Sequence, residues 1–147
     1  EIEASVRALD GLADLLDAAY YVPRGHMRTA AVERRSFNLI HLKTMFKIDV
    51  FVSKGRPFDQ AAAGRARAQG LDDTPDAPRL LVGSAEDTVL AKLEWFRLGG
   101  ETSERQWWDI VGVLRVNPDV DAGYLHRWAA ELSVADLLDR ALAQAAE

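Results

Sequence analysis

Apolar residues recur at helical spacing through much of the chain, and the clearest helix lies at residues 84–98. Ser84 is a favourable N-cap, and the Gly99–Gly100 pair predicts a left-handed end. A second helix is expected at residues 103–115, with Ser103 as its cap. Because so few residues join the two helices, we expect them to form an antiparallel hairpin.

The remaining pattern predicts both helices and strands. Alternating or continuous apolar runs at residues 37–42 and 46–52 flank Lys43-Thr44-Met45, which predicts a β-hairpin with a three-residue loop. Residues 79–82 read as a further short strand, and residues 18–22 as a short β-prone run. Further helices are expected at residues 2–17, 27–35, 57–69 (stopped by Gly70), 121–132 (capped by Asp121) and 133–142 (capped by Ser133).

These elements predict an α+β fold with a small sheet in the first half and a helical bundle in the second. We expect residues 1–83 and 84–147 to pack as one domain. The 147 residues are 48% hydrophobic and 28% charged, include no cysteine, and contain no apolar run long enough to span a bilayer. A cytoplasmic globular protein without a membrane partner is therefore expected. The chain opens on Glu1 rather than methionine, which indicates a fragment or a processed product.

Lys92 and Asp109 are candidates for a functional pair. Lys92 lies six residues before Leu98, and Asp109 lies six residues after Ser103. The two residues are therefore equally far from the link between the helices, and their side chains are expected to meet. Two interpretations stay open: a simple clamp between helices, or an ammonium group that lies over a phosphate with Asp109 orienting it. Arg105 is poorly placed for the helix dipole, so it should pair with Asp87, with Glu86 or with a phosphate.

Asp49 is an acid inside an apolar strand. An unpaired buried carboxylate is costly, so it should face water, pair with Lys47 or an arginine, or bind a metal ion. If Asp49 binds a metal ion, Mg²⁺ is the ion expected for a carboxylate ligand, although one carboxylate does not make a metal site. The three histidines, His26, His41 and His126, show no metal-ligand spacing.

The charge is unevenly distributed. The net charge is −5, but residues 24–47 carry six basic residues and one acid, a local charge of +5 that includes Arg34 and Arg35. This stretch is either a solvated face or a surface for phosphates. The four tryptophans, Trp95, Trp107, Trp108 and Trp128, are expected in the core rather than as stacking platforms for bases.

Several short blocks, taken in this order, resemble a known family. They are Ser36-Phe37-Asn38-Leu39-Ile40-His41, then Phe46-Lys47-Ile48-Asp49-Val50-Phe51, then Ser84-Ala85-Glu86-Asp87 with Leu90, Lys92 and Leu93, then Ser103-Glu104-Arg105-Gln106-Trp107 with Asp109 and Ile110. Residues 6–142 resemble bacterial nucleotidyltransferase-fold proteins related to the abortive-infection toxins of toxin–antitoxin systems. The resemblance implies a small mixed sheet with flanking helices, followed by a helical region. It also implies Mg²⁺-dependent transfer of a nucleoside monophosphate from a nucleoside triphosphate to a hydroxyl, with pyrophosphate as the leaving group. RNA and protein are both open as the acceptor.

The resemblance assigns roles to individual residues. Asp49 matches the third catalytic acid and metal ligand, and Lys92 and Asp109 match the basic and acidic positions of the helical half. Lys47, Arg105, Arg34 and Arg35 are the candidates for phosphate binding.

The chain departs from the family in one respect. No Gly-Ser turn followed by a paired-acid Asp-x-Asp strand precedes Asp49, so that portion is either missing or lost. Because two-metal transfer needs all three carboxylates, we expect this chain alone to be inactive. The alternative is a degenerate fold that binds a nucleotide, a nucleic acid or a protein. A sheet without its strand pair would also expose an edge, which favours homo-oligomers.

Overall fold

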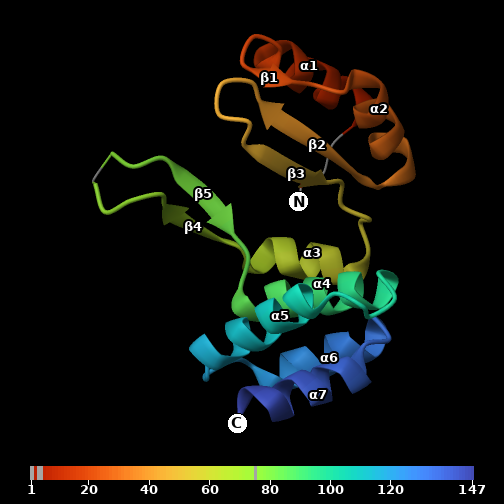
Figure 1. Ribbon diagram of the computed structural model, residues 1–147, viewed down its shortest axis with the longest axis vertical. Helices are drawn as coiled ribbons and strands as arrows, with labels where there is room; N and C mark the ends of the chain where they lie inside the picture. The colour runs from red at the N-terminus through yellow and green to blue at the C-terminus, as the bar shows by residue number, and fades with distance from the viewer. Residues whose placement is uncertain (1, 3–4, 75) are drawn as a thin grey trace. The chain divides into compact units, whose positions relative to one another are not determined.

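The computed structural model describes residue 2 and residues 5–74 and 76–147. These residues form seven helices and two small antiparallel sheets, which confirms the α+β class (Figure 1). The helices are α1 (Val6–Leu16), α2 (Arg24–Glu33), α3 (Pro57–Arg65), α4 (Ala85–Leu98), α5 (Glu104–Val116), α6 (Ala122–Glu131) and α7 (Ala135–Ala145). The strands are β1 (Tyr20–Tyr21), β2 (Ser36–His41), β3 (Lys47–Phe51), β4 (Arg67–Gly70) and β5 (Arg79–Val82).

The chain divides into two compact units, Glu1–Gln60 and Ala61–Glu147. The division falls inside α3, earlier in the chain than the expected boundary between residues 83 and 84. Among the described residues of both units, no helix combines the length and the apolar character needed to cross a membrane.

The first unit is built on a three-stranded antiparallel sheet in the order β1-β2-β3. The predicted hairpin at residues 37–52 is confirmed, and its register places Asn38 opposite Asp49. Its connection is longer than the expected three residues, because β2 ends at His41 and β3 begins at Lys47, which leaves residues 42–46 between the strands. The expectation of one mixed sheet is wrong for the described residues: β4 and β5 form a second, separate sheet, and the parallel pairing recorded is an isolated bridge between Ile2 and Val52. One face of the first sheet packs against α1 and α2 through Leu9, Ala13, Met27, Ala30, Phe37, Leu39 and Val52.

The second unit contains the helical bundle α4–α7. Its core consists of side chains that are almost fully buried, among them Val89, Leu90, Leu93, Ile110, Val111, Leu125 and Leu138. The expected placement of all tryptophans in the core is wrong in two cases. Trp107 is buried, whereas Trp95 is 38% and Trp108 52% exposed. Trp95 precedes the buried Phe96 on α4, and Trp108 follows the buried Trp107 on α5. Because successive residues of an α-helix are about 100° apart around its axis, both tryptophans point away from the core-facing side.

Two further boundaries differ from the sequence-based expectation. The helix expected at residues 57–69 ends at Arg65, and residues 67–70 instead form β4, which pairs with β5. Ser133 does not cap the last helix: it adopts a left-handed conformation (φ 57°), and Val134 occupies the N-cap without a side-chain hydrogen bond. Ser133 instead helps to end α6, because its N–H donates to the Ala130 carbonyl.

Candidate functional site

The helical hairpin α4–α5 carries the first candidate residues, and its local structure follows its sequence. The Ser84 hydroxyl accepts a hydrogen bond from the Asp87 N–H at 3.1 Å, and the Ser103 hydroxyl accepts one from the Gln106 N–H at 3.3 Å. Gly100 adopts a left-handed conformation (φ 73°) that ends α4 and turns the chain into α5. These caps fix where the two helices begin and end, and therefore which side chains lie level with each other.

Lys92 and Asp109 meet across this hairpin, which confirms their expected proximity. The Lys92 Nζ lies 3.1 Å from Asp109 Oδ2, and the two side chains are 28% and 50% exposed. An ion pair with this much solvent exposure contributes little to stability, typically about 0–1 kcal/mol. A ligand anion could therefore compete for Lys92 at small cost to the fold.

Asp49 lies on the face of the first sheet that α1 and α2 do not cover. Its carboxylate accepts a hydrogen bond from the Asn38 side chain, directly across the hairpin, and pairs with Lys47 at 3.0 Å. Both charged side chains are about half exposed, at 50% for Asp49 and 56% for Lys47. The strand thus keeps its acid in water, paired with lysine, rather than buried in the core.

The described residues do not supply a complete site for Mg²⁺. Among them, no three His, Asp or Glu side chains converge in an arrangement that could hold a metal ion. Asp49 contributes a single carboxylate, one oxygen of which is already engaged by Lys47 and Asn38. Hard divalent cations take several oxygen ligands, so Asp49 alone does not fit the ion.

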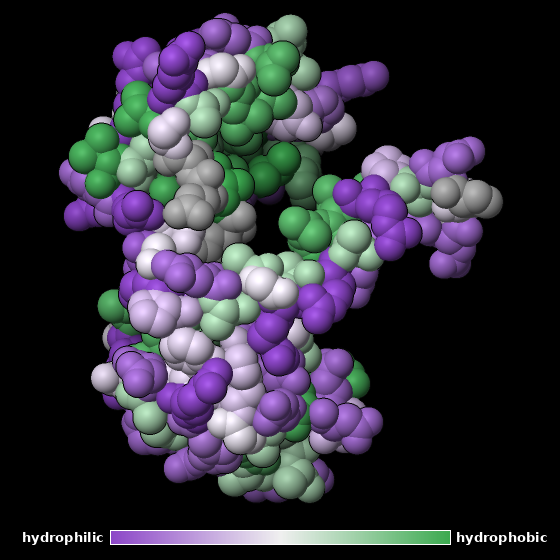
Figure 2. Space-filling model, turned by 180° about the vertical axis from the view of Figure 1, so that it is seen from behind, coloured by the Kyte–Doolittle hydropathy of each residue, from purple (hydrophilic) through white to green (hydrophobic). Residues whose placement is uncertain are grey.

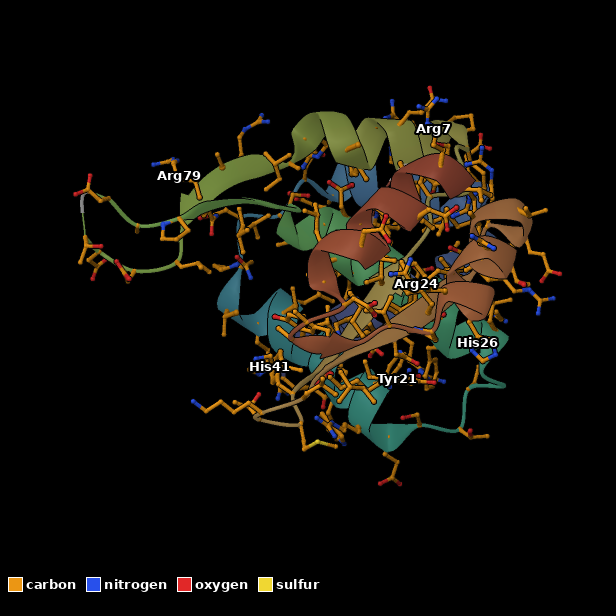
Figure 3. All side chains as sticks on the ribbon, turned by 90° about the horizontal axis from the view of Figure 1, so that it is seen from above. Arg7, Tyr21, Arg24, His26, His41 and Arg79 are labelled. Carbon is orange, nitrogen blue, oxygen red and sulfur yellow. The ribbon has the colours of Figure 1, made fainter. Side chains whose placement is uncertain are left out.

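The basic stretch at residues 24–47 is largely neutralised within the first unit. Arg24 pairs with Asp14 at 2.7 Å and with Asp17, and Arg28 pairs with Asp10 at 2.9 Å (Arg24 is labelled in Figure 3). The three aspartates belong to α1 and its end, outside the stretch from which the local charge was counted. The sequence-based count therefore overstates the positive charge that this surface offers to phosphates.

The two arginines singled out for phosphate binding have separate partners. The Arg34 guanidinium donates to the Ser53 carbonyl at 2.5 Å, and Arg35 pairs with Glu33 at 3.1 Å. Arg34 is also the left-handed residue (φ 52°) that ends α2. Its hydrogen bond ties the end of α2 to the segment after β3, which is a structural role.

Arg105 is exposed at the start of α5, and the expectation that it pairs with Glu86 or Asp87 is wrong. Those acids bind Arg65 instead. The Arg65 guanidinium lies 2.9 Å from Glu86 Oε2 and 3.3 Å from Asp87 Oδ2. In the part of the chain that the structure describes, Arg105 makes no ion pair, so its guanidinium is available to a ligand.

The acids at the start of α4 belong to a polar network that sequence reasoning missed. Asp87 is only 5% exposed, and its carboxylate accepts hydrogen bonds from the Ser84 hydroxyl at 2.6 Å and from the Tyr124 hydroxyl at 2.6 Å. The Arg65 guanidinium also stacks over the Tyr124 ring, 4.1 Å from its centroid. The network joins α3, α4 and α6, so it positions the N-terminus of α4.

This network shifts two ionisation equilibria. Burial raises the pKa of Tyr124, and its hydrogen bond to the Asp87 carboxylate raises it further, so the phenol stays protonated and donates. Partial burial acts to raise the pKa of Glu86, but the Asp121 N–H and the other donors outweigh it, with help from Arg65, and hold this pKa at about 2. Both groups therefore serve as fixed structural charges and donors near neutral pH rather than as acids or bases.

Asp49 belongs to the first compact unit, and Lys92, Asp109 and Arg105 belong to the second. The chain matches no known protein-family model, no curated protein and no solved structure. Any functional assignment must therefore rest on the chemistry of these residues and on the sequence resemblance.

Proposed function

We propose that the chain is a nucleotidyltransferase-like protein that binds the phosphates of a nucleoside triphosphate through Lys92. The contact between Lys92 and Asp109 carries this proposal. The sequence resemblance assigns a basic and an acidic functional position to these two residues, which lie within hydrogen-bond distance of each other. Asp109 holds the ammonium group on the surface of the hairpin, where solvent reaches both side chains.

Arg105 is the second cation of the proposed phosphate site. It lies four residues before Asp109 on α5, and residues at this spacing share one face of a helix. A guanidinium can bind a phosphate through two parallel hydrogen bonds, whereas an ammonium acts as a compact charge. Lys92 and Arg105 together would therefore favour a polyphosphate over a single phosphate.

We further propose that this chain alone binds nucleotide without transferring it. The sequence resemblance matches Asp49 to the third catalytic acid of the family. The other two acids, an Asp-x-Asp pair, are absent from the sequence before Asp49, and the described residues around Asp49 do not supply two carboxylates in their place. In this proposal Mg²⁺ enters with the triphosphate in solution. The proposal places the protein in the cytoplasm, where nucleoside triphosphates are abundant.

Two assays on the purified chain test this proposal. In equilibrium dialysis with a labelled nucleoside triphosphate, inorganic tripolyphosphate should compete, because the phosphates supply the contact. Failure of tripolyphosphate to compete would overturn phosphate-led binding. In a second assay, Mg²⁺-dependent labelling of RNA or protein that Asp49→Ala abolishes would overturn the expected inactivity.

A binding module for nucleic acid is the second candidate. Its basis is the cluster of arginines in the first unit, but ion pairs with Asp10, Asp14 and Asp17 offset much of that charge. If RNA is the ligand, the Arg34→Glu/Arg35→Glu double variant should bind it more weakly and with a smaller dependence on salt. RNA binding that does not respond to salt would count against this candidate.

A further inference from the structure

Trp108 is an exposed tryptophan on the helical hairpin that carries Lys92. It lies on α5 and is 52% exposed. Its neighbour Trp107 is buried, donates its indole N–H to the Gln144 side chain at 2.8 Å, and lies under the Arg140 guanidinium, whose Cζ is 3.7 Å from the ring centroid. Within the described residues, the Trp108 indole makes no hydrogen bond and no contact with another ring or a cation. Its ring is therefore open to a ligand.

Arg105 lies three residues before Trp108 on α5. Residues at this spacing are neighbours on the helix surface, with Cβ atoms about 5–6 Å apart. Helical side chains lean towards the N-terminus, so the indole extends over the turn that carries Arg105. The guanidinium is exposed and makes no ion pair among the residues that the structure describes. An aromatic ring and a cation without internal partners are thus adjacent on this helix.

The proposed phosphate site lies on the same side of α5 as the indole. Because successive residues are about 100° apart around the axis, four residues of α5 fall within one arc of about 100°. In order around this arc they are Trp108, Gly112, Arg105 and Asp109. Asp109 in turn holds the Lys92 Nζ at 3.1 Å. The surface therefore runs from the indole past the guanidinium to the ammonium group.

Gly112 leaves the surface beside the indole bare. It lies four residues after Trp108, and a Cβ at this position would meet nothing within 4 Å. A longer side chain here would lean back over Trp108 and Asp109. Glycine inside a helix costs stability relative to alanine, and Gly112 has neither a positive φ nor a close neighbour that requires it. Its consequence is an uncovered strip next to the ring, wide enough for a flat ligand.

The apolar surface around Trp108 is too small for a protein-binding patch, which usually needs a contiguous apolar area. The large exposed apolar residues in the described part of α4–α7 are Trp95, Leu98, Trp108 and Val116. Val116, the other one on α5, lies more than two turns beyond Trp108. Figure 2 shows mainly hydrophilic colouring on the face of the helical bundle that it presents, in the lower part of the picture. A single ring beside cations suits a small ligand with an aromatic group and negative charges.

We propose that the Trp108 indole stacks on the base of the nucleoside triphosphate whose phosphates bind Lys92 and Arg105. This inference rests on the proposed function, because it places the base beside the same phosphate site. Stacking on an aromatic ring accepts every base, since every base has a π-face. Purines bind more tightly than pyrimidines, because their two fused rings cover more of the indole. The ligand class is therefore a nucleoside triphosphate of either base type, with purines preferred.

Two ligands separate stacking from phosphate binding, because adenosine triphosphate carries a base and inorganic tripolyphosphate does not. Isothermal titration calorimetry in the presence of Mg²⁺ measures the affinity for both. Trp108→Ala should weaken adenosine triphosphate binding at least about fivefold, the effect of losing one stacked base, and leave tripolyphosphate binding unchanged. Trp108→Phe keeps an aromatic ring, so it should retain more affinity for adenosine triphosphate. Phe46→Ala, at an aromatic residue that is 67% exposed between β2 and β3, is the matched control and should bind both ligands like the wild type.

Gly112→Leu tests the bare strip without removing the indole. Leucine favours the helix, so the variant keeps its fold, while its side chain covers the strip beside the ring. It should weaken adenosine triphosphate binding at least about fivefold and tripolyphosphate binding less. Gly11→Leu, at a glycine of α1 that also has open space for a Cβ, is the matched control and should leave both affinities unchanged.

A loss of affinity confined to the ligand with a base, in both Trp108→Ala and Gly112→Leu, would support the proposal. Unchanged adenosine triphosphate binding by Trp108→Ala, or equal losses for the two ligands, would overturn stacking and leave the phosphate site of the proposed function standing. Adenosine, which has a base and no phosphate, identifies the opposite failure. If it binds the wild type but not Trp108→Ala, and tripolyphosphate does not compete, stacking is retained and phosphate-led binding is overturned. If the wild type binds none of the three, both proposals are overturned.

Discussion

The Tyr124 hydroxyl donates a 2.6 Å hydrogen bond to the Asp87 carboxylate, which joins α6 to the first turn of α4 across 37 positions of the chain. Asp87 is among the few charged side chains recorded as buried in the described residues. A buried carboxylate needs every donor that its surroundings supply. The position of α4, and hence of Lys92, therefore depends on a contact with α6.

Tyr124→Phe should lower the free energy of unfolding by about 1–3 kcal/mol, because it removes a donor from a buried carboxylate. Urea denaturation followed by circular dichroism measures this change. Tyr21→Phe is the matched control, since Tyr21 is 57% exposed, and it should change stability little. Equal effects of the two substitutions would contradict the structural role of the Tyr124 hydroxyl.

The low pKa of Glu86 predicts a loss of stability in acid. Its pKa falls from an ordinary value of 4.5 to about 2 on folding, so the folded state binds its proton less readily. The stabilisation is therefore complete above pH 4.5 and is lost as the pH falls towards 2, by an amount on the order of 1–3 kcal/mol. Glu86→Gln should flatten the fall in urea midpoint between these pH values.

Glu104→Gln, at an exposed acid in the first turn of α5, is the control for this pH dependence. It should leave the acid-induced fall in urea midpoint close to that of the wild type. If Glu86→Gln and the wild type lose the same stability between pH 5 and pH 2, Glu86 is not the group responsible.

The Lys92–Asp109 pair should contribute little to folding. A double-mutant cycle with Lys92→Ala and Asp109→Asn should give a coupling energy below about 1 kcal/mol, as is typical of exposed ion pairs. Thermal and urea unfolding of the four proteins measure it. A coupling energy above about 2 kcal/mol would instead favour the interpretation of the pair as a clamp between helices.

Two glycines should respond to alanine in opposite directions. Gly100 adopts a positive φ of 73°, so Gly100→Ala should destabilise the protein by about 1 kcal/mol although a Cβ would find open space there. Gly112 lies inside α5 and also has open space for a Cβ, so Gly112→Ala should stabilise by about 0.5–1 kcal/mol. Unfolding midpoints measure both changes, and shifts of the same sign would contradict the assigned backbone conformations.

Features encoded over a few residues could be predicted from the sequence. The caps at Ser84 and Ser103 and the left-handed Gly100 follow from local hydrogen bonding and sterics. Because those three features set the hairpin, the meeting of Lys92 and Asp109 could also be predicted. The β2–β3 hairpin followed from its apolar pattern in the same way.

Features that depend on distant residues could not be predicted. Arg65 meets Asp87 across 22 positions and Tyr124 meets it across 37, and no local pattern encodes either contact. Residues 67–70 have the composition of a helix end, but pairing with β5 makes them a strand, which is a tertiary effect that overrides local preference. The magnesium site and the nucleotidyltransferase activity stay predictions, since they rest on the sequence resemblance.

The central claim is that Lys92 binds the phosphates of a nucleoside triphosphate. Equilibrium binding of the four common nucleoside triphosphates, measured in the presence of Mg²⁺ for the wild type, Lys92→Ala and Lys43→Ala, tests it most directly. Lys43 is an exposed lysine in the β2–β3 turn and serves as the charge-matched control. Lys92→Ala should weaken binding at least about tenfold, whereas Lys43→Ala should not. Equal affinities of Lys92→Ala and the wild type, or equal losses in both variants, would contradict the claim.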